Sequence, residues 1–141
     1  MRLDPRPDNA CFGCGGANAR GMMLAFEQDD DRRRIVGKFR IGSEYQGGSG
    51  YLHGGIIALL LDEAMGKACR FHGERAVTAD LRVEYLRPIR VDQDIVVEGF
   101  IARREGRQLY HEGEIRDASG GLLARGQGRF VVIDPAKYGV R

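Results

Sequence analysis

Two adjacent acidic residues, Asp62 and Glu63, sit inside a mostly apolar segment of the chain. Asp62 lies in Gly55–Phe71, where Ile, Leu, Ala and Met fill most of the other positions. A carboxylate in such surroundings loses contact with water, so its pKa should rise towards values that suit a general base. Glu63 is expected to be a surface charge or an interface partner, because this chemistry needs only one carboxylate. The alternative is that both acids form a solvated patch on a helix.

A glycine-rich stretch, Gly42–Gly54, precedes this segment, and the sequence Tyr51-Leu52-His53-Gly54-Gly55 spans the junction of the two. Two glycines at a helix start let a ligand approach backbone N–H groups that have no partner within the helix. The helix dipole favours negative charge at the same end. These features would stabilise the oxyanion that forms when a carbonyl, such as that of a thioester, is attacked. His53 would add a donor or hold the loop; a tight entry turn is the simpler alternative.

Asp62 follows His53 by nine positions, or about 13 Å along a helix. The two residues are therefore not expected to form a pair within one chain, and a second chain would complete the site. Thr78 falls on the polar side of an alternating strand, where it could bind a nucleophilic water or simply fill the sheet. Arg87, held between Leu86 and Pro88, is the best placed arginine for binding phosphates. The others weighed for that role are Arg103, Arg104 and Arg107.

Cys11-Phe12-Gly13-Cys14 pairs two cysteines without a second pair or a histidine at zinc-finger spacing. A closed metal site would need ligands from elsewhere, so the two thiols are expected to pack the N-terminal segment. Cys69 is expected to be a small core residue. No metal and no cofactor are predicted. Gly47-Gly48-Ser49-Gly50 lacks the final glycine of a serine-hydrolase elbow, and no nucleotide-binding glycine motif occurs.

The elements that would position these residues are one helix and six strands. The segments Met22–Glu27 and Ile35–Ile41 are expected to form a hairpin. The helix Gly55–Phe71 is apolar on nearly every side, which predicts that it is buried. Val77–Tyr85 alternates strictly, with the apolar residues on one face and Thr78 on the other. Three further predicted strands are Ile95–Ala102, Gln108–Arg116 and Leu122–Ile133.

The resulting order predicts an α+β fold in which a curved, mainly antiparallel sheet grips one helix. Glycines within the later strands, at positions 99, 113, 126 and 128, are expected to mark bulges or sharp curvature. The 141 residues are expected to form a single domain, 1–141, with an irregular N-terminal segment, 1–21. Exposed sheet edges make dimerisation plausible.

Composition excludes several classes of protein. Hydrophobic residues make up 43%, charged residues 30%, and the net charge is +2. These values are typical of a soluble globular domain and give no reason to expect a nucleic-acid or membrane partner. The longest apolar run, Ile56–Leu61, is too short to cross a bilayer, and Met1–Asn9 shows no secretory signal. Three cysteines in a chain of this size favour a reducing, cytoplasmic location.

Several short motifs occur in a consistent order between Cys11 and Val132. They are Cys11-Phe12-Gly13-Cys14-Gly15, Gln46-Gly47, His53-Gly54-Gly55, Asp62-Glu63-Ala64 and Tyr85-Leu86-Arg87-Pro88. In these motifs the chain resembles the phenylacetate-pathway and THEM-type hotdog thioesterases. The resemblance implies a hotdog fold, with one long central helix wrapped by a curved antiparallel sheet. It also implies a homodimer, or a tetramer that is a dimer of dimers, with active sites between subunits.

The resemblance further implies hydrolysis of an acyl-CoA thioester to a carboxylic acid and free coenzyme A. Asp62 would act as general base or nucleophile, and Gly55 would donate its N–H to the thioester oxygen with help from His53. Thr78 would come from the partner chain and position water. The expected substrate-binding residues are Gln46, Gly54 and Arg87. The acyl group, and the choice between coenzyme A and a carrier protein, stay open.

Two other functions fit the same residues. One is a non-hydrolytic module that binds acyl-CoA as a sensor or regulator. The other is a hotdog hydratase acting on enoyl-CoA, which is disfavoured because a closely spaced Asp–His pair is missing from the motif.

Overall fold

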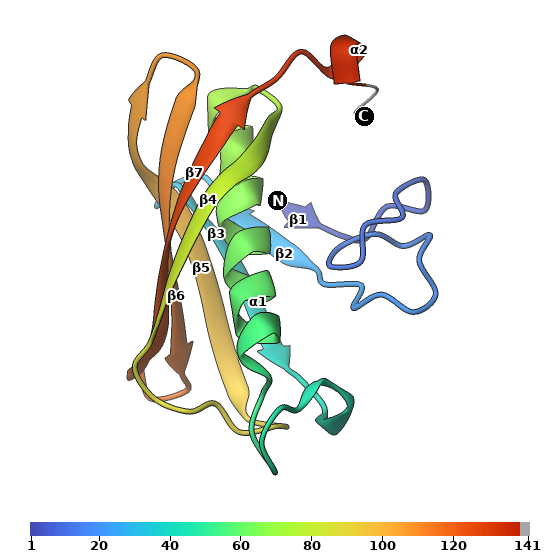
Figure 1. Cartoon of the computed structure of the whole chain (residues 1–141), viewed down its shortest axis with the longest axis vertical. Helices are drawn as coiled ribbons and strands as arrows, with labels where there is room; N and C mark the ends of the chain where they lie inside the picture. The colour runs from blue at the N-terminus through green and yellow to red at the C-terminus, as the bar shows by residue number, and fades with distance from the viewer. Residues whose placement is uncertain (139–141) are drawn as a thin grey trace.

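The computed structural model describes residues 1–138, which form one antiparallel sheet with a long helix against one face (Figure 1). The strand order is β1-β2-β3-β5-β6-β7-β4. The strands are β1 Arg2–Leu3, β2 Phe26–Asp29, β3 Arg34–Arg40, β4 Ala76–Tyr85, β5 Asp94–Glu105, β6 Gln108–Asp117 and β7 Leu122–Val132. The helices are α1 Gly54–Lys67, which continues as a 3₁₀ helix over Ala68–His72, the 3₁₀ turn Ser43–Tyr45 and α2 Pro135–Tyr138.

This architecture confirms the predicted α+β hotdog arrangement. From β2 to β7 the elements follow the predicted order, and β2 and β3 form the predicted antiparallel hairpin. One short strand was not expected: β1, in the segment predicted to be irregular, pairs with β2. Positions 139–141 of the predicted domain lie outside the described residues.

The predicted strand Met22–Glu27 was wrong over its first four residues, because β2 begins at Phe26. Met22 donates its N–H to the Phe12 carbonyl at 2.7 Å, and Leu24 donates to Gly13 at 2.9 Å. Met23 has a positive φ of 49°, which breaks the extended conformation. The residues before β2 therefore run along the N-terminal segment instead of the sheet.

Glycines in the middle of the sheet make room for the helix. Gly99, Gly113 and Gly126 lie opposite one another in register across β5, β6 and β7. A Cβ at Gly99 would collide with the Ala64 carbonyl, and one at Gly113 would lie 3.1 Å from the Leu61 side chain. The four glycines had been expected to mark bulges or curvature; in the structure these three form a row that lets the backbone of α1 approach the sheet, and Gly128 lies outside it, opposite His111.

The sheet buries one side of α1. Leu60, Leu61, Ala64 and Met65 are fully buried against it. The helix had been predicted to be buried on nearly every side, and this is wrong for a single chain: Asp62 and several apolar neighbours are only partly buried. A second surface would be needed to cover that side.

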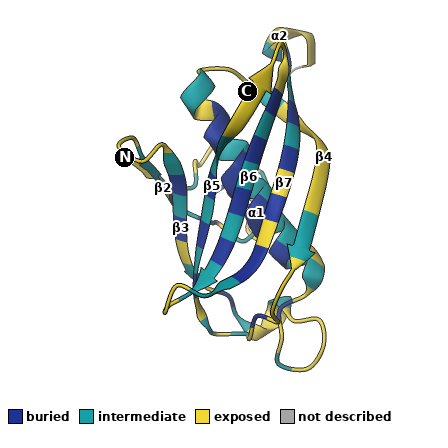
Figure 2. Cartoon of the chain, turned by 90° about the vertical axis from the view of Figure 1, so that its left-hand side faces the viewer, coloured by how far each residue is buried: buried dark blue, intermediate teal, exposed yellow. Residues whose placement is uncertain are grey.

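β4 is the strand at one edge of the sheet and is mostly exposed (Figure 2). Its apolar side chains Val77, Leu81 and Tyr85 are exposed, as is Leu86 just beyond it. A free strand edge of this kind is a ready template for pairing with another chain.

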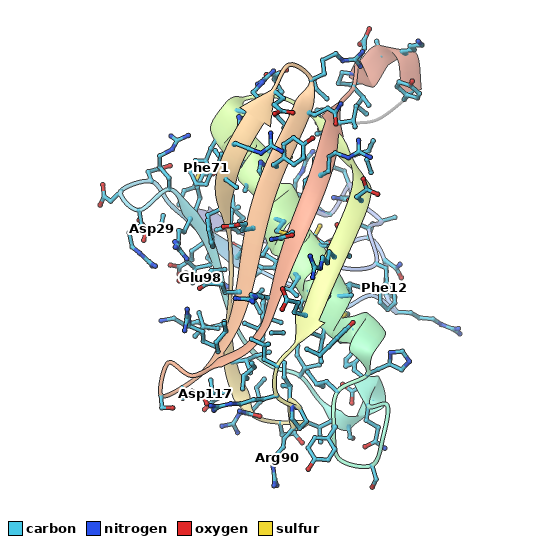
Figure 3. All side chains as sticks on the ribbon, turned by 60° about the vertical axis from the view of Figure 1, so that its left-hand side comes forward. Phe12, Asp29, Phe71, Arg90, Glu98 and Asp117 are labelled. Atoms are coloured by element: carbon cyan, nitrogen blue, oxygen red, sulfur yellow. The ribbon has the colours of Figure 1, made fainter. Side chains whose placement is uncertain are left out.

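The outer face of the sheet is covered with charged side chains, among them Glu98 (Figure 3). Two ion pairs are Arg34 Nη1 with Glu98 Oε2 at 2.7 Å and Arg125 Nη2 with Glu84 Oε2 at 3.2 Å. Over residues 1–138, the helices are all too short or too polar to span a lipid bilayer.

Candidate active site

His53 organises the start of α1. It is the N-cap residue, and its Nδ1 accepts the Gly55 N–H at 2.8 Å. The His53 carbonyl accepts the N–H groups of Ile56 and Ile57 at 3.0 and 3.1 Å. A neutral His53 ring therefore carries its hydrogen on Nε2, which leaves a side-chain donor at an exposed position. His53 had been predicted either to add a side-chain donor or to hold the loop. In the structure its hydrogen bonds hold the loop and the helix start together.

The glycine-rich loop folds back on His53. The His53 N–H donates to the Tyr45 carbonyl at 3.0 Å. A Cβ at Gly47 would lie 3.1 Å from the His53 Cα. Gln46 uses its side-chain oxygen to accept the Gly50 N–H at 3.2 Å. Gln46 thus stabilises the loop that precedes the helix start.

Asp62 is held by a strand residue of its own chain. The Thr78 hydroxyl donates to Asp62 Oδ1 at 2.8 Å. Burial raises the pKa of the Asp62 carboxyl, the Thr78 hydrogen bond lowers it, and the charge of Glu63 raises it, with a net shift upward. The upward direction is the one expected for a general base near neutral pH.

Thr78 faces the helix because β4 is irregular beside it. The register with β7 shifts between Thr78 and Asp80, so Ala79 is an extra residue at a β-bulge. Strict alternation had placed Thr78 on the polar face, and this was wrong. The structure joins Thr78 to Asp62 of the same chain; the threonine from the partner chain that the resemblance implies stays a prediction.

The structure does not bring Asp62 to the helix start. Gly55 and Asp62 lie seven positions apart on α1, which corresponds to about 10 Å. A carbonyl oxygen bound at the Gly55 N–H would lie beyond hydrogen-bonding reach of this Asp62. The predicted site residues therefore form two half-sites within one chain.

A pocket of about 330 Å³ lies beside the helix start. Gly54, Arg87 and Leu86 line it together with Tyr51 and Tyr85. The Tyr85 hydroxyl donates to the Gly54 carbonyl at 2.8 Å. The sequence had marked Tyr85 as an apolar strand residue and as the first residue of the Tyr85-Leu86-Arg87-Pro88 motif, but it gave the side chain no role; its hydroxyl group was the overlooked signal of a polar role.

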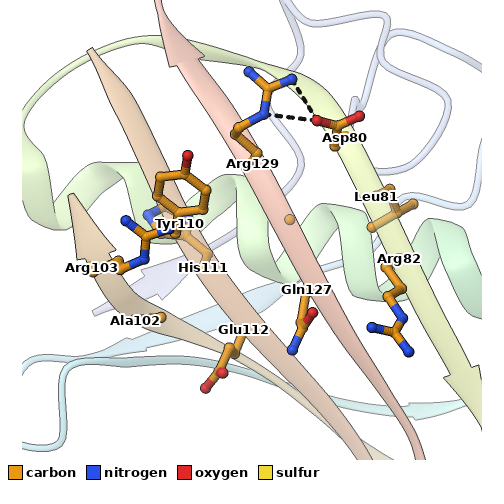
Figure 4. A pocket seen from close by; sticks show the side chains of 11 residues that line it. Asp80, Leu81, Arg82, Ala102, Arg103, Tyr110, His111, Glu112, Gln127 and Arg129 are labelled. Atoms are coloured by element: carbon orange, nitrogen blue, oxygen red, sulfur yellow. Dashed lines mark hydrogen bonds and ion pairs between the residues drawn. The ribbon is translucent and has the colours of Figure 1, made fainter. Parts of the chain in front are cut away.

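A larger hollow of about 610 Å³ lies on the outer face of the sheet (Figure 4). Its lining includes the ion pair between Arg129 and Asp80, at 2.5 Å, together with Arg103. None of the predicted site residues lines it. The other two arginines considered for phosphate binding are engaged within the chain. Arg104 forms an ion pair with Glu74, and Arg107 donates to the Val132 carbonyl at 2.6 Å.

The three cysteines are free thiols. Cys69 is buried, as expected of a core residue, and burial raises its pKa to about 11. Cys11 and Cys14 are partly buried next to Glu63. Burial and then the charge of Glu63 raise the pKa of the Cys14 thiol to about 12. Glu63, expected at a surface or an interface, instead contacts the N-terminal segment.

Comparison with known proteins identifies the family. The model of the thioesterase superfamily matches residues 49–124, which include the helix start, Asp62 and Thr78. The chain belongs to the thioesterase superfamily. Membership confirms the resemblance noted in the sequence motifs.

Curated members of the superfamily are similar over most of this chain. Acyl-coenzyme A thioesterase THEM4 of Rattus norvegicus is 31% identical over 118 residues, which is 83% of this chain and 51% of that protein. THEM4 of Bos taurus is 29% identical over 127 residues, 89% of this chain and 52% of that protein. The chain thus spans about half the length of these relatives.

Proteins of known structure share the fold. A thioesterase superfamily protein of known crystal structure has a TM-score of 0.80 at 31% identity, covering 86% of this chain and 60% of its own. The smu.793 protein of Streptococcus mutans, solved bound to acetyl CoA, has a TM-score of 0.68 at 17% identity, covering 71% of this chain and 81% of its own. The second likeness concerns the fold alone.

Proposed function

We propose that this chain is an acyl-CoA thioesterase that hydrolyses a thioester to a carboxylic acid and free coenzyme A. The observation that carries the proposal is the partly buried Asp62 carboxylate held by Thr78 beside the exposed strand β4. Support comes from the curated relatives named acyl-coenzyme A thioesterases.

Asp62 drives the attack on the thioester carbonyl. The raised pKa makes its carboxylate a stronger base than an aspartate in water. Thr78 fixes one carboxylate oxygen, which leaves the other to take a proton from water or to attack the carbonyl directly. The Thr78 hydroxyl oxygen can accept a hydrogen bond from that water, which Asp62 contacts as well.

The start of α1 stabilises the oxyanion. Gly55 is exposed and lacks a side chain, so a carbonyl oxygen can approach its N–H. In the free chain His53 Nδ1 occupies this N–H. The thioester oxygen would therefore displace the His53 ring from the Gly55 N–H, or it would accept a hydrogen bond from the His53 Nε2–H in addition to one from Gly55.

Two chains complete each site. Because Asp62 and Gly55 of one chain lie about 10 Å apart along the helix, the donor must come from a second copy. Pairing of two β4 edges would put two α1 helices side by side in opposite directions, with Gly55 of one beside Asp62 of the other. The same pairing would cover the partly exposed side of α1. A homodimer is thus the smallest working unit.

The pocket beside Gly54 is proposed as the place where substrate enters. Tyr51, Tyr85 and Leu86 supply apolar walls, and Arg87 supplies a charge that suits the phosphates of coenzyme A. Gln46 acts from the loop, by keeping the helix start in place.

One observation favours a second candidate, the non-hydrolytic acyl-CoA sensor. The Gly55 N–H is already hydrogen-bonded within the chain, so the free protein does not present an open oxyanion site. Binding of acyl-CoA would raise the melting temperature of such a module, but no coenzyme A thiol would be released.

A panel of acyl-CoA thioesters, varied in chain length and aryl content and assayed for free thiol, tests the proposal. We expect turnover of at least one thioester, and a fall of about 100-fold or more in Asp62→Asn, the scale of a lost general base. The variant should melt at the same or a higher temperature, because the charged carboxylate no longer needs to be desolvated.

Thermal stabilisation by acyl-CoA with no thiol release across the panel would favour the sensor. Normal turnover by folded Asp62→Asn would remove the proposed role of this residue.

A further inference from the structure

The N-terminal segment lies on the side of α1 that faces away from β5 and β6 (Figure 1). Two of its thiols meet a carboxylate of α1 there. Cys11 and Cys14 come from the N-terminal segment, and Glu63 comes from the helix. The ligand atoms of the three side chains all lie within 4.8 Å of one another. The Cys11 thiol donates to Glu63 Oε1 at 3.4 Å. The sequence alone offered only the cysteine pair; the fold supplies a third group 49 or more positions away.

The loop that carries both thiols is fixed in place. Gly15 donates its N–H to the Cys11 carbonyl at 2.9 Å, and Asn9 accepts the Cys11 N–H at 2.9 Å. Gly13 lies against Glu63 so closely that a Cβ there would collide with the carboxylate. Glycine at this position lets the turn between the cysteines close over the acid. The two sulfur atoms are thus presented to Glu63 by backbone geometry.

The donor set and its spacing fit zinc. Zinc binds cysteine sulfur at about 2.3 Å and carboxylate oxygen at about 2.1 Å, usually in tetrahedral geometry. Those bond lengths put a sulfur and an oxygen ligand about 3.6 Å apart, and two sulfurs about 3.8 Å apart. The observed 3.4 Å between Cys11 Sγ and Glu63 Oε1 is close to that value. Thiolates also favour zinc over magnesium or calcium.

We propose that Cys11, Cys14 and Glu63 bind one zinc ion per chain. Water or a further side chain would take the fourth position. The ion would join the N-terminal segment to α1 at the residue next to Asp62, so its role is to hold that face of the helix. The site is separate from hydrolysis, and its existence does not depend on the proposed activity.

Cobalt titration of the whole chain tests the proposal. The protein is stripped with a chelator, kept reduced with a phosphine, and titrated with cobalt chloride while thiolate-to-cobalt absorption is recorded. We expect saturation at one ion per chain, bleaching by an equivalent of zinc, and a higher melting temperature when zinc is bound.

Variants identify the ligands. Cys11→Ser and Cys14→Ser should lose the charge-transfer band, and Glu63→Gln should weaken zinc binding about tenfold or more. Cys69→Ala is the matched control, because it removes the third cysteine and should keep the band. Circular dichroism verifies that each variant is folded.

Absence of thiolate absorption at saturating cobalt would overturn the proposal. So would a band that survives in either serine variant, or Glu63→Gln with unchanged affinity. These outcomes are independent of whether any thioester is hydrolysed.

Discussion

Burial and Thr78 act on the Asp62 carboxylate in opposite directions. Burial disfavours the charged form and raises its pKa, while the Thr78 hydroxyl stabilises that form and lowers it. The balance sets the pH above which the Asp62 carboxyl is ionised. In the proposed mechanism the threonine therefore tunes the base as well as orienting it.

Replacing Thr78 with valine should shift the acid limb of the kcat/KM profile to higher pH. The variant removes the hydroxyl that stabilises the carboxylate, so the Asp62 pKa rises further. At neutral pH we expect a loss of about tenfold, since a hydrogen bond to a charged group contributes about 1.5 kcal/mol. The pH dependence of thiol release measures both effects.

Thr78→Ser is the matched control for that variant, because it keeps the hydroxyl and should retain the wild-type profile. An unchanged acid limb in Thr78→Val would exclude the tuning role.

Residue types alone revealed part of the site. Asp62 stands out as an acid among apolar neighbours, and His53 and Gly55 stand out as a cap and an open helix start. The side on which Thr78 lies was hidden, because alternation does not reveal the bulge at Ala79. Glu63 beside Cys11 was hidden as well, since that contact depends on tertiary packing.

At the scale of elements, α1 depends on the row of glycines beneath it. Gly99→Ala would force a methyl group into the Ala64 carbonyl, so α1 or β5 must shift. Overpacking of this kind costs about 2 kcal/mol, and the melting temperature should fall by several degrees.

Gly48→Ala is the control for this change. A Cβ at Gly48 meets nothing within 4 Å, so its melting temperature should match that of the wild type. Equal melting temperatures for Gly99→Ala and Gly48→Ala would show that the helix does not need the glycine row.

A pair of histidines links the end of the helix to β6. His111 Nδ1 lies 2.8 Å from the Met65 carbonyl, and its Nε2 lies 3.1 Å from His72 Nε2. A carbonyl only accepts, so His111 carries its hydrogen on Nδ1 and accepts at Nε2 from His72. A proton added to His111 would break the contact with His72.

Stability should therefore fall in acid. Burial is the main cause that lowers the pKa of both rings below the ordinary value of 6.5. The unfolded chain binds protons more readily than the folded one as pH drops through that value, so the stabilisation present above it is lost below it. We expect the melting temperature to decrease between about pH 7 and about pH 5.

His111→Gln keeps a donor for Met65 but cannot take up a proton. This variant should lose much of the acid dependence, even if it is less stable at neutral pH. An acid dependence equal to that of the wild type would assign the effect to other groups.

At the scale of the whole molecule, the fold was the most predictable feature. Strand periodicity and one apolar helix were enough to predict a sheet gripping a helix, because both patterns are local. The predicted start of a strand was wrong where tertiary hydrogen bonds compete with sheet pairing. This is the case at Met22 and Leu24, whose N–H groups donate to carbonyls of the N-terminal segment. The exposed β4 edge and the partly open side of α1 leave room for a second chain.

Mixed dimers of two inactive variants test the central claim, which is that Asp62 of one chain acts with Gly55 of the other. Asp62→Asn removes the carboxylate, and Gly55→Pro removes the N–H at a position in the first helical turn where proline is tolerated. Each homodimer should be inactive towards the thioester found with the panel. The mixed dimer, purified through two different tags, contains one intact site and should show about half the wild-type turnover per dimer. A mixed dimer no more active than its parents would contradict the shared site.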